Sequence, residues 1–323
     1  MTRPSLTERY LSPRSSREGP ASFALGCMNF GKRTPKAEAV RVIHTALDAG
    51  VGLFDTANAY NDGVSEQILG EALRGRGDQA LIASKVGFGQ INGKPEGLSR
   101  ANVIAACEAS LGRLGVDAID LYYLHVPDYS TPIEESLGAI QTLLEAGKIR
   151  HWGVSNYASW QILEMKGLLG MPAVAQQVYN VLVRQLDIEY FKFTARYPIH
   201  TTVYNPLAGG ILVGAHAPEQ RPPKGSRFDN NSRYRRRYWN RALFAATEDL
   251  RSIAADQGVT LLQLAYAFVL RHPGVDSVLV GPGSVSHLED ALVARELALS
   301  PDSRARIDAV YRDLVGTDAS YAR

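Results

Sequence analysis

Cysteine is scarce in this chain: only Cys27 and Cys107 occur among 323 residues. They lie far apart and form no CxxC pair or Cys/His array, so the sequence offers neither a disulfide framework nor a zinc site. Such usage is typical of a reducing compartment, and we expect a cytoplasmic protein. No His/Asp/Glu cluster recurs where metal-dependent barrels place one, so we expect no metal requirement.

Long apolar runs and an excess of charge are missing as well. No apolar segment reaches the roughly 18 to 20 residues that cross a bilayer, and the polar opening segment lacks the apolar core of a signal peptide. The formal net charge is only +2, so we expect neither nucleic acid nor a membrane surface as a partner. With 45% hydrophobic and 21% charged residues, the composition is that of a globular protein with a large core.

The chain does contain a regular alternation of short β-type runs and longer helical patterns. Eight such runs are expected to be strands, at 23–28, 52–57, 80–86, 118–125, 149–155, 174–179, 200–205 and 277–281. Apolar residues at three- and four-residue spacing predict helices between them, at 35–49, 64–73, 100–114, 132–145, 160–169, 247–256 and 261–270.

Strands that alternate with helices are parallel, and eight of them can close into a single-domain (β/α)₈ TIM barrel over residues 1–323. The alternative is an open doubly wound sheet, but the expected G-x-G-x-x-G motif does not follow the first strand. Residues 1–22 would be an N-terminal extension that caps the barrel or is partly disordered. The segment 207–238, after the seventh strand, is long and rich in Gly, Pro and Arg, as lids and binding loops are.

Four polar residues lie at or just beyond expected strand ends, where a barrel forms its active site. Asp55 ends the second strand, Tyr60 follows it, Lys85 ends the third and His125 ends the fourth. Each alone has an ordinary structural explanation, such as a helix cap, a packed loop, a solvated turn or a core histidine. Together they are expected to converge on the barrel mouth.

This set of residues suits the reduction of a carbonyl, in which a hydride reaches carbon and a proton must reach oxygen. The Tyr60 hydroxyl could supply the proton, and a nearby Lys85 cation is expected to lower its pKa from about 10. Asp55 would hold Lys85 charged and in place. His125 would direct a ring N–H at the carbonyl oxygen.

The segments around these residues resemble one family closely. FDTANAY with SEQILGEAL, and DLYYLHVPDYSTPIEESL with GKIRHWGVSNY, are similar in order and spacing to the aldo-keto reductases. SNYASWQI, YNPLAGGIL and YRRRYW are most similar to the aflatoxin-aldehyde and succinic-semialdehyde reductase branch. The resemblance implies an NAD(P)H-dependent oxidoreductase that reduces aldehydes or ketones to alcohols, with Tyr60 as the general acid.

The resemblance also implies a coenzyme site along the barrel mouth. Its nicotinamide carboxamide would be bound by Ser155, Asn156 and Gln177, with Tyr204 stacked beneath the ring. The pyrophosphate would meet the turn formed by Asn205, Pro206, Leu207 and Gly209, with Arg227 as a clamp. An adenosine 2′-phosphate would lie at the start of the last βα unit, near Gly281, Ser284 and His287, where a helix N-terminus attracts anions. Taken alone, that glycine-rich stretch is better explained as an ordinary βα turn.

Two positions depart from the NADP-binding pattern of the family. Gly283 stands where Arg or Ser is usual, and Ala291 stands where Asn is usual. These departures weaken the expected preference for NADP. NADP remains the expected cofactor, with NAD still open.

The substrate is less closely specified. Arg237 and Arg323 match carboxylate-binding arginines of the resembling branch, and Met28 would add an apolar wall. Because a guanidinium binds a carboxylate through two hydrogen bonds, we expect a carboxylate-bearing aldehyde, such as succinic semialdehyde, or a dicarbonyl. Two alternatives remain: a keto-sugar or secondary-metabolite ketone as substrate, or a non-catalytic, cofactor-binding regulatory subunit of potassium channels. The branch is often dimeric, so a homodimer is a further expectation.

Overall fold

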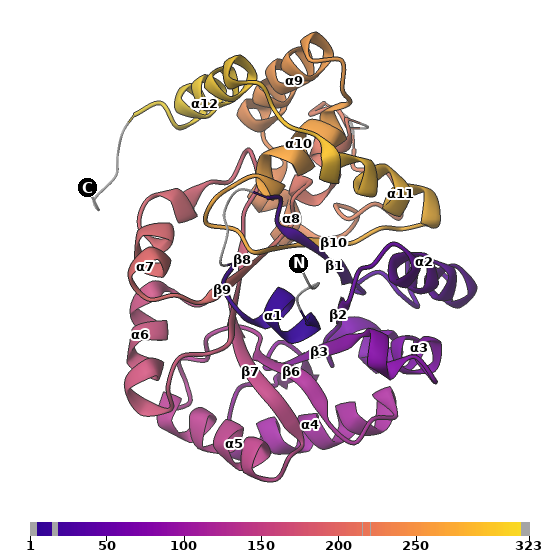
Figure 1. The fold of residues 1–323 in the computed structure, drawn as a ribbon, viewed down its shortest axis with the longest axis vertical. Helices are drawn as coiled ribbons and strands as arrows, with labels where there is room; N and C mark the ends of the chain where they lie inside the picture. Colours follow the sequence, from indigo (N-terminus) through magenta and orange to yellow (C-terminus); the bar gives the residue numbers. More distant parts are fainter. Residues whose placement is uncertain (1–4, 15–18, 215, 220, 318–323) are drawn as a thin grey trace.

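Eight parallel strands close into a barrel in this computed structural model, which describes residues 5–14, 19–214, 216–219 and 221–317 (Figure 1). The strands neighbour one another in the order β1-β10-β9-β8-β7-β6-β3-β2, which confirms the predicted (β/α)₈ fold. Their bounds are β1 Ser22–Gly26, β2 Leu53–Asp55, β3 Leu81–Val86, β6 Ile119–Leu124, β7 Ile149–Ser155, β8 Val174–Val178, β9 His200–Tyr204 and β10 Ser277–Val280.

Helices surround the barrel (Figure 1), and their buried apolar residues form one hydrophobic cluster with strand residues such as Phe23 and Leu25. They are α2 Lys36–Asp48, α3 Val64–Ala72, α4 Arg100–Leu114, α5 Ile133–Glu145, α6 Ser159–Leu168, α7 Tyr190–Arg196, α9 Arg241–Asp256, α10 Leu261–Leu270, α11 Val285–Val293 and α12 Pro301–Val315. The strands alternate between two cores: Phe23 and Leu25 face the helices, whereas Ala24 between them faces the barrel interior.

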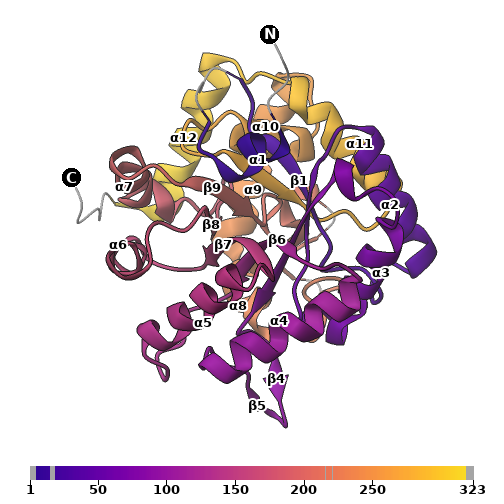
Figure 2. The same ribbon diagram turned by 60° about the horizontal axis from the view of Figure 1, so that its bottom comes forward.

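The structure adds elements that the hydrophobic pattern did not predict, namely α7 and α12. It also begins α9 at Arg241 rather than near residue 247, because the Asn240 side chain caps the helix by accepting the Leu243 N–H at 2.9 Å. A hairpin of β4 (Gln90–Ile91) and β5 (Lys94–Pro95) projects from the connection between β3 and α4 (Figure 2).

The long connection after β9 contains secondary structure and is not an open loop. It contains the 3₁₀ segment η4 (Ala208–Val213) and the short helix α8 (Ser232–Tyr238). Phe228 is wholly buried and packs against Trp239 at 4.9 Å and His216 at 5.4 Å between ring centroids. This aromatic cluster gives the connection a small core of its own.

The N-terminal helix α1 (Leu6–Leu11) lies across the opening of the barrel at which the strands begin (Figure 1). Tyr10 is wholly buried there; its hydroxyl donates to the Phe23 carbonyl at 2.9 Å and accepts from the Gly52 N–H at 3.0 Å. Both partners stand at or just before the start of a strand, so α1 closes the end opposite the expected active site.

No single helix in the described ranges is long and apolar enough to span a membrane. Taken as a pair, α9 and α10 pass a test of length and composition, with a bend of 91° at the break between them. Across the same residues, no group of three or more His, Cys, Asp and Glu side chains could hold a metal ion.

The Tyr10 hydroxyl should contribute measurably to stability. Tyr10→Phe leaves the ring in place but deprives a buried N–H and a buried carbonyl of their partner, so we expect the free energy of unfolding to fall by about 1–3 kcal/mol. Urea denaturation followed by circular dichroism measures this. Tyr129→Phe is the matched control, because that side chain is 84% exposed and should leave the midpoint unchanged. An unchanged midpoint in Tyr10→Phe would contradict the assigned role.

Candidate active site

The four predicted catalytic residues meet at the end of the barrel where the strands finish. Lys85, in β3, extends its Nζ to the Asp55 carboxylate at the end of β2 and donates to the Thr56 carbonyl at 2.8 Å. The same Nζ lies over the Tyr60 ring, 5.2 Å from its centroid. The Tyr60 ring in turn meets the His125 ring edge-on, with centroids 5.9 Å apart.

Asp55 and Lys85 form an almost completely buried ion pair. The second oxygen of Asp55 accepts a hydrogen bond from Gln176 Nε2, in β8, at 2.8 Å. Burial lowers the pKa of Lys85, and the Asp55 carboxylate opposes that shift. The pair and its hydrogen bonds therefore fix an ammonium group beneath Tyr60 in a place from which water is excluded.

The expected lowering of the Tyr60 pKa is wrong. Burial of the hydroxyl, followed by the charge of Asp55, raises the pKa of Tyr60 well above its usual value. The reason is that Asp55 offsets the Lys85 charge, and that Nζ lies over the ring face. Tyr60 is thus kept in its protonated form at neutral pH, which is the form able to donate a proton.

His125 is held as a neutral imidazole. Burial lowers its pKa well below the usual value, and the charges of Lys85 and Arg233 lower it further. Its Nδ1 is buried and has no hydrogen-bond partner among the described residues. The ring therefore has hydrogen-bonding capacity left for a ligand.

A left-handed turn places Tyr60 in the mouth. Asn61 and Asp62 have φ of 51° and 54°, and Gly63 follows with φ of 84°. Asn, Asp and Gly are the residues that tolerate this conformation best. The Asn61 side chain secures the turn by donating to the Phe30 carbonyl at 2.6 Å and to the Met28 carbonyl at 3.3 Å, whereas the apolar wall expected of the Met28 side chain stays a prediction.

The residues predicted to hold the nicotinamide lie together at the ends of β7, β8 and β9. Asn156 Nδ2 donates to the His125 carbonyl at 2.9 Å and to Ser155 Oγ at 3.1 Å, while its Oδ1 accepts from the Tyr204 hydroxyl at 2.5 Å. Gln177 Nε2 donates to the Tyr157 carbonyl at 2.6 Å. These hydrogen bonds fix the orientation of each polar group beside the four predicted catalytic residues.

Positive charge gathers next to that region, where the pyrophosphate was expected. Arg227 reaches Asn205 Oδ1 and Asn29 Oδ1, each at 3.3 Å, and Arg33 reaches the same Asn29 oxygen at 3.4 Å. Burial and the like charge of Arg227 lower the pKa of Arg33. Asn205 Nδ2 is buried and unpartnered within the described ranges. Two adjacent guanidinium groups and an amide N–H with no partner fit a diphosphate; Asn29 and Arg33 carried no sequence signal.

The predicted turn after β9 needs glycine at Gly209. Gly209 has φ of 72°, and a Cβ there would lie 3.0 Å from Tyr234 and 3.1 Å from Phe228. The turn thereby lies close to Phe228, which belongs to the aromatic cluster of the connection after β9. The other predicted members of the turn, Asn205, Pro206 and Leu207, lie two to four residues before Gly209. Gly281 lies across the mouth, where its carbonyl accepts from Asn29 Nδ2 at 3.3 Å.

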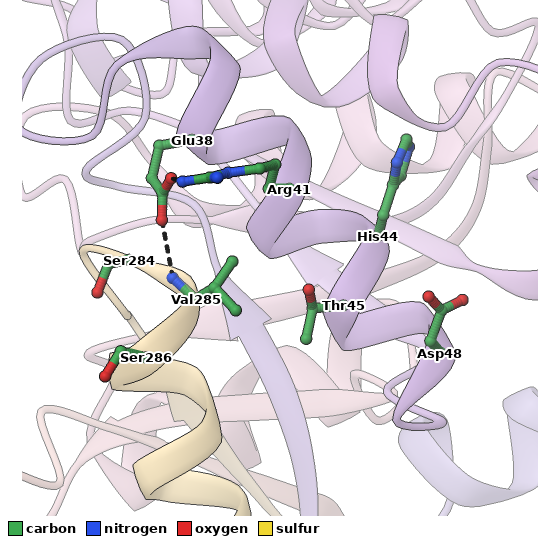
Figure 3. Close-up of a pocket in the computed structure, with 8 residues that line it drawn as sticks. All are labelled: Glu38, Arg41, His44, Thr45, Asp48, Ser284, Val285 and Ser286. Atoms are coloured by element: carbon green, nitrogen blue, oxygen red, sulfur yellow. Dashed lines mark hydrogen bonds and ion pairs between the residues drawn. The ribbon is translucent and has the colours of Figure 1, made fainter.

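The predicted phosphate site at the start of α11 is already covered by a carboxylate. Glu38 Oε1, from α2, accepts the Val285 N–H at 2.9 Å, and Ser284 Oγ accepts the His287 N–H at 3.3 Å (Figure 3). Glu38 also pairs with Arg41, and these side chains line a pocket of about 530 Å³ between the two helices. Because two donors of the helix N-terminus are used and one partner is negative, this end is less suited to a phosphate than the sequence indicated.

The predicted substrate arginines have different outcomes. The Arg237 guanidinium lies beside the Tyr204 hydroxyl at the barrel mouth, where it opposes the rise in the Tyr204 pKa that burial causes. Arg323 lies outside the described residues.

Comparison with known proteins agrees with this site. A model of the aldo/keto reductase family matches residues 22–312. The chain belongs to this family. Membership implies NAD(P)H-dependent carbonyl reduction as the chemistry of the tetrad, by which we mean Asp55, Tyr60, Lys85 and His125.

This aldo-keto reductase has relatives with different roles. It is 34% identical to aflatoxin B1 aldehyde reductase member 2 of Homo sapiens, with 84% of this chain and 81% of the relative covered. It is 32% identical to a probable voltage-gated potassium channel subunit beta of Arabidopsis thaliana, with 91% and 93% covered. The glycerol dehydrogenase of Gluconobacter oxydans superposes with a TM-score of 0.79 at 27% identity, with 97% and 98% covered.

The protonation of His125 gives the reductase a testable pH dependence. The pKa of His125 in the folded protein lies below the unfolded value of about 6.5. Below that pH the unfolded chain binds a proton that the folded chain does not. His125 therefore makes stability fall as the pH drops below about 6.5. We expect ring ¹⁵N NMR to show a neutral His125 at pH 6. Arg233→Gln should raise its pKa, because one nearby cation is lost. A His125 signal titrating near pH 6.5 would refute the neutral assignment.

Proposed function

We propose that this aldo-keto reductase reduces an aldehyde or ketone to the alcohol, with Tyr60 as the general acid. The observation that carries the proposal is the assembled tetrad, in which a protonated Tyr60 lies between the Lys85 ammonium and the neutral His125 ring. A bound nicotinamide coenzyme would supply the hydride. The chain's own residues would bind the carbonyl and deliver the proton.

Each residue has a separate task in that reaction. A ring N–H of neutral His125 would donate to the carbonyl oxygen, orienting it and stabilising negative charge as it develops. The Tyr60 hydroxyl would give its proton to the same oxygen. Lys85, held by Asp55, would keep the Tyr60 ring in place, since its ammonium lies over the ring face. The raised pKa of Tyr60 thus keeps the proton available until the substrate oxygen accepts it.

A regulatory subunit is the second function that the relatives suggest, because two of them are named as probable voltage-gated potassium channel β subunits. A protein that only binds a coenzyme would have no need of a buried Asp55–Lys85 pair beneath a protonated tyrosine. The complete tetrad therefore favours an enzyme.

The Tyr60→Phe variant tests the proposal. It removes the proton donor and keeps the ring, so we expect kcat/KM for aldehydes to fall by about 10²- to 10⁴-fold. Coenzyme affinity, measured by fluorescence titration, should not change. Tyr197→Phe, at the end of α7, is the matched control and should retain full activity. Wild-type protein that binds coenzyme tightly but reduces no aldehyde or dicarbonyl would instead favour the regulatory role.

For the coenzyme we propose NADPH with weak discrimination against NADH. Arg33 and Arg227 would bind the pyrophosphate that both coenzymes share. Ser284 and His287 support a 2′-phosphate at the start of α11, but Glu38 opposes it with a carboxylate on the Val285 N–H. Gly283 and Ala291 add no polar side chain there.

Removing the Glu38 charge should sharpen the preference for NADPH. We expect Glu38→Gln to lower the Kd of NADPH by about fivefold and to leave that of NADH unchanged. Coenzyme fluorescence titration gives both constants. Asp48→Asn removes the same charge at the far end of the pocket and should change neither. Equal effects on both coenzymes would mean that Glu38 does not face the 2′-phosphate.

For the substrate we propose a small carbonyl compound that carries a carboxylate, or a dicarbonyl. Arg237 supports this, since its guanidinium lies at the mouth beside Tyr204. A keto-sugar or secondary-metabolite ketone is the alternative, and an assay panel containing semialdehydes, ketosugars and quinones separates them. A cytoplasmic location and a homodimer also remain proposals, based on the cysteine usage and on the resembling branch.

A further inference from the structure

The Lys85 ammonium lies over a second aromatic ring besides that of Tyr60. Its Nζ is 5.5 Å from the ring centroid of Tyr123, compared with 5.2 Å for Tyr60. Tyr123 belongs to β6, two residues before His125, and its side chain is wholly buried. The reaction described above gives this tyrosine no task.

Tyr123 points into the barrel, unlike the tyrosine that precedes it. Successive side chains of a strand face opposite sides, so Leu121 and Tyr123 belong to the core inside the barrel, whereas Tyr122 packs in the core between the strands and the helices. Both tyrosines are wholly buried. The chain therefore holds two tyrosines of equal burial in one strand, of which only Tyr123 contacts the Lys85 ammonium.

The Tyr123 ring fills a space that a glycine leaves open. Gly153, its partner in β7, has no Cβ; an atom there would lie 2.8 Å from two carbons of the Tyr123 ring and 2.9 Å from the Val174 carbonyl oxygen. Such distances are too short for carbon atoms that do not share a bond. The ring thus lies directly against the β7 backbone, which limits its movement.

The Tyr123 hydroxyl is a less plausible functional group than the ring. Burial, followed by the charge of Asp55, raises the pKa of Tyr123 well above its usual value, although Gln176 and Thr202 lie close enough to oppose the rise. Within the described ranges the hydroxyl has no hydrogen bond of good geometry. The contact that connects Tyr123 to the tetrad is therefore the one between its ring and Lys85.

The ammonium needs such a contact because its hydrogen bonds are incomplete. A lysine ammonium has three N–H donors, and the described residues offer Lys85 Nζ two acceptors, the Asp55 carboxylate and the Thr56 carbonyl. No water reaches a wholly buried side chain freely, and the electron-rich face of an aromatic ring attracts a cation most strongly where water is excluded. The two tyrosine rings thus supply what the acceptors do not.

We propose that Tyr123 is a positioning residue of the reaction, whose ring holds the Lys85 ammonium in its place over the Tyr60 ring. An ammonium held in this way keeps Tyr60 oriented for proton transfer, so loss of the Tyr123 ring slows the chemical step and leaves the binding of coenzyme and carbonyl unchanged. This inference rests on the proposed reductase activity.

Two leucine variants test the position of the ring. We expect Tyr123→Leu to lower kcat about tenfold with little change in KM, since a desolvated contact between a cation and a ring contributes about that factor. Tyr122→Leu is the matched control: it removes the same ring from the other face of β6, so it should cost stability but keep the wild-type kcat. Tyr123→Phe keeps the ring and should retain most of the activity.

Fluorination separates the attraction of the ring from its packing. Replacing Tyr123 by 3,4,5-trifluorophenylalanine keeps the shape of a phenylalanine and weakens the negative charge of the ring face, so we expect kcat about threefold below that of Tyr123→Phe, with the same Tm. The same replacement at Tyr122 should leave kcat unchanged. This comparison needs no large change in the core, so it also decides the matter if Tyr123→Leu does not fold.

Two outcomes would contradict the proposal in different ways. If the phenylalanine and trifluorophenylalanine variants at position 123 have equal kcat, or if Tyr122→Leu loses as much kcat as Tyr123→Leu, Tyr123 only fills space and the positioning role is overturned, while the reductase proposal stands. If the wild-type protein reduces no aldehyde, ketone or dicarbonyl with either coenzyme, both proposals are overturned.

Discussion

The buried ion pair between Asp55 and Lys85 is the interaction on which the site depends. Neither charge is stable in the barrel interior without the other, because desolvation of an unpaired ion costs far more than one hydrogen bond returns. Hydrogen bonds to the Thr56 carbonyl and to Gln176 complete the pair and join β2, β3 and β8. This arrangement places a fixed ammonium under the Tyr60 ring before any substrate arrives, so the reaction requires little reorganisation of the protein.

The division of labour in the molecule follows from this rigid centre. The proposed catalytic residues come from β2 and β3 and from the residues that follow β2 and β6, whereas the connections after β3 and β9 supply Phe88, Arg227 and Arg233. Such connections are often variable in barrels. Here each is anchored, one by the Glu96 carboxylate and the other by the aromatic packing of Phe228. The segments proposed for recognition are therefore ordered by their own buried contacts.

The sign of the charge changes over a short span along the proposed coenzyme site. Arg33 and Arg227 crowd around one amide oxygen, at a cost in like-charge repulsion that an anion would relieve. At the start of α11 the Glu38 carboxylate satisfies the N–H that a phosphate would otherwise bind. The charges of this proposed site thus suit the diphosphate that all nicotinamide dinucleotides share. They are less suited to a further phosphate on the ribose.

The sequence by itself determined the barrel and the identity of the tetrad. Period-two and period-3.6 patterns report burial on each strand and helix, and the ends of parallel strands necessarily meet, so Asp55, Lys85 and His125 could be placed together without coordinates. Only the tertiary structure decided the direction of the Tyr60 pKa, the covering of α11 by Glu38 and the contact of Lys85 with the Tyr123 ring. Each of these depends on how far a charge or ring lies from a residue remote in sequence, and on how much water remains between them. Periodicity carries no information about either.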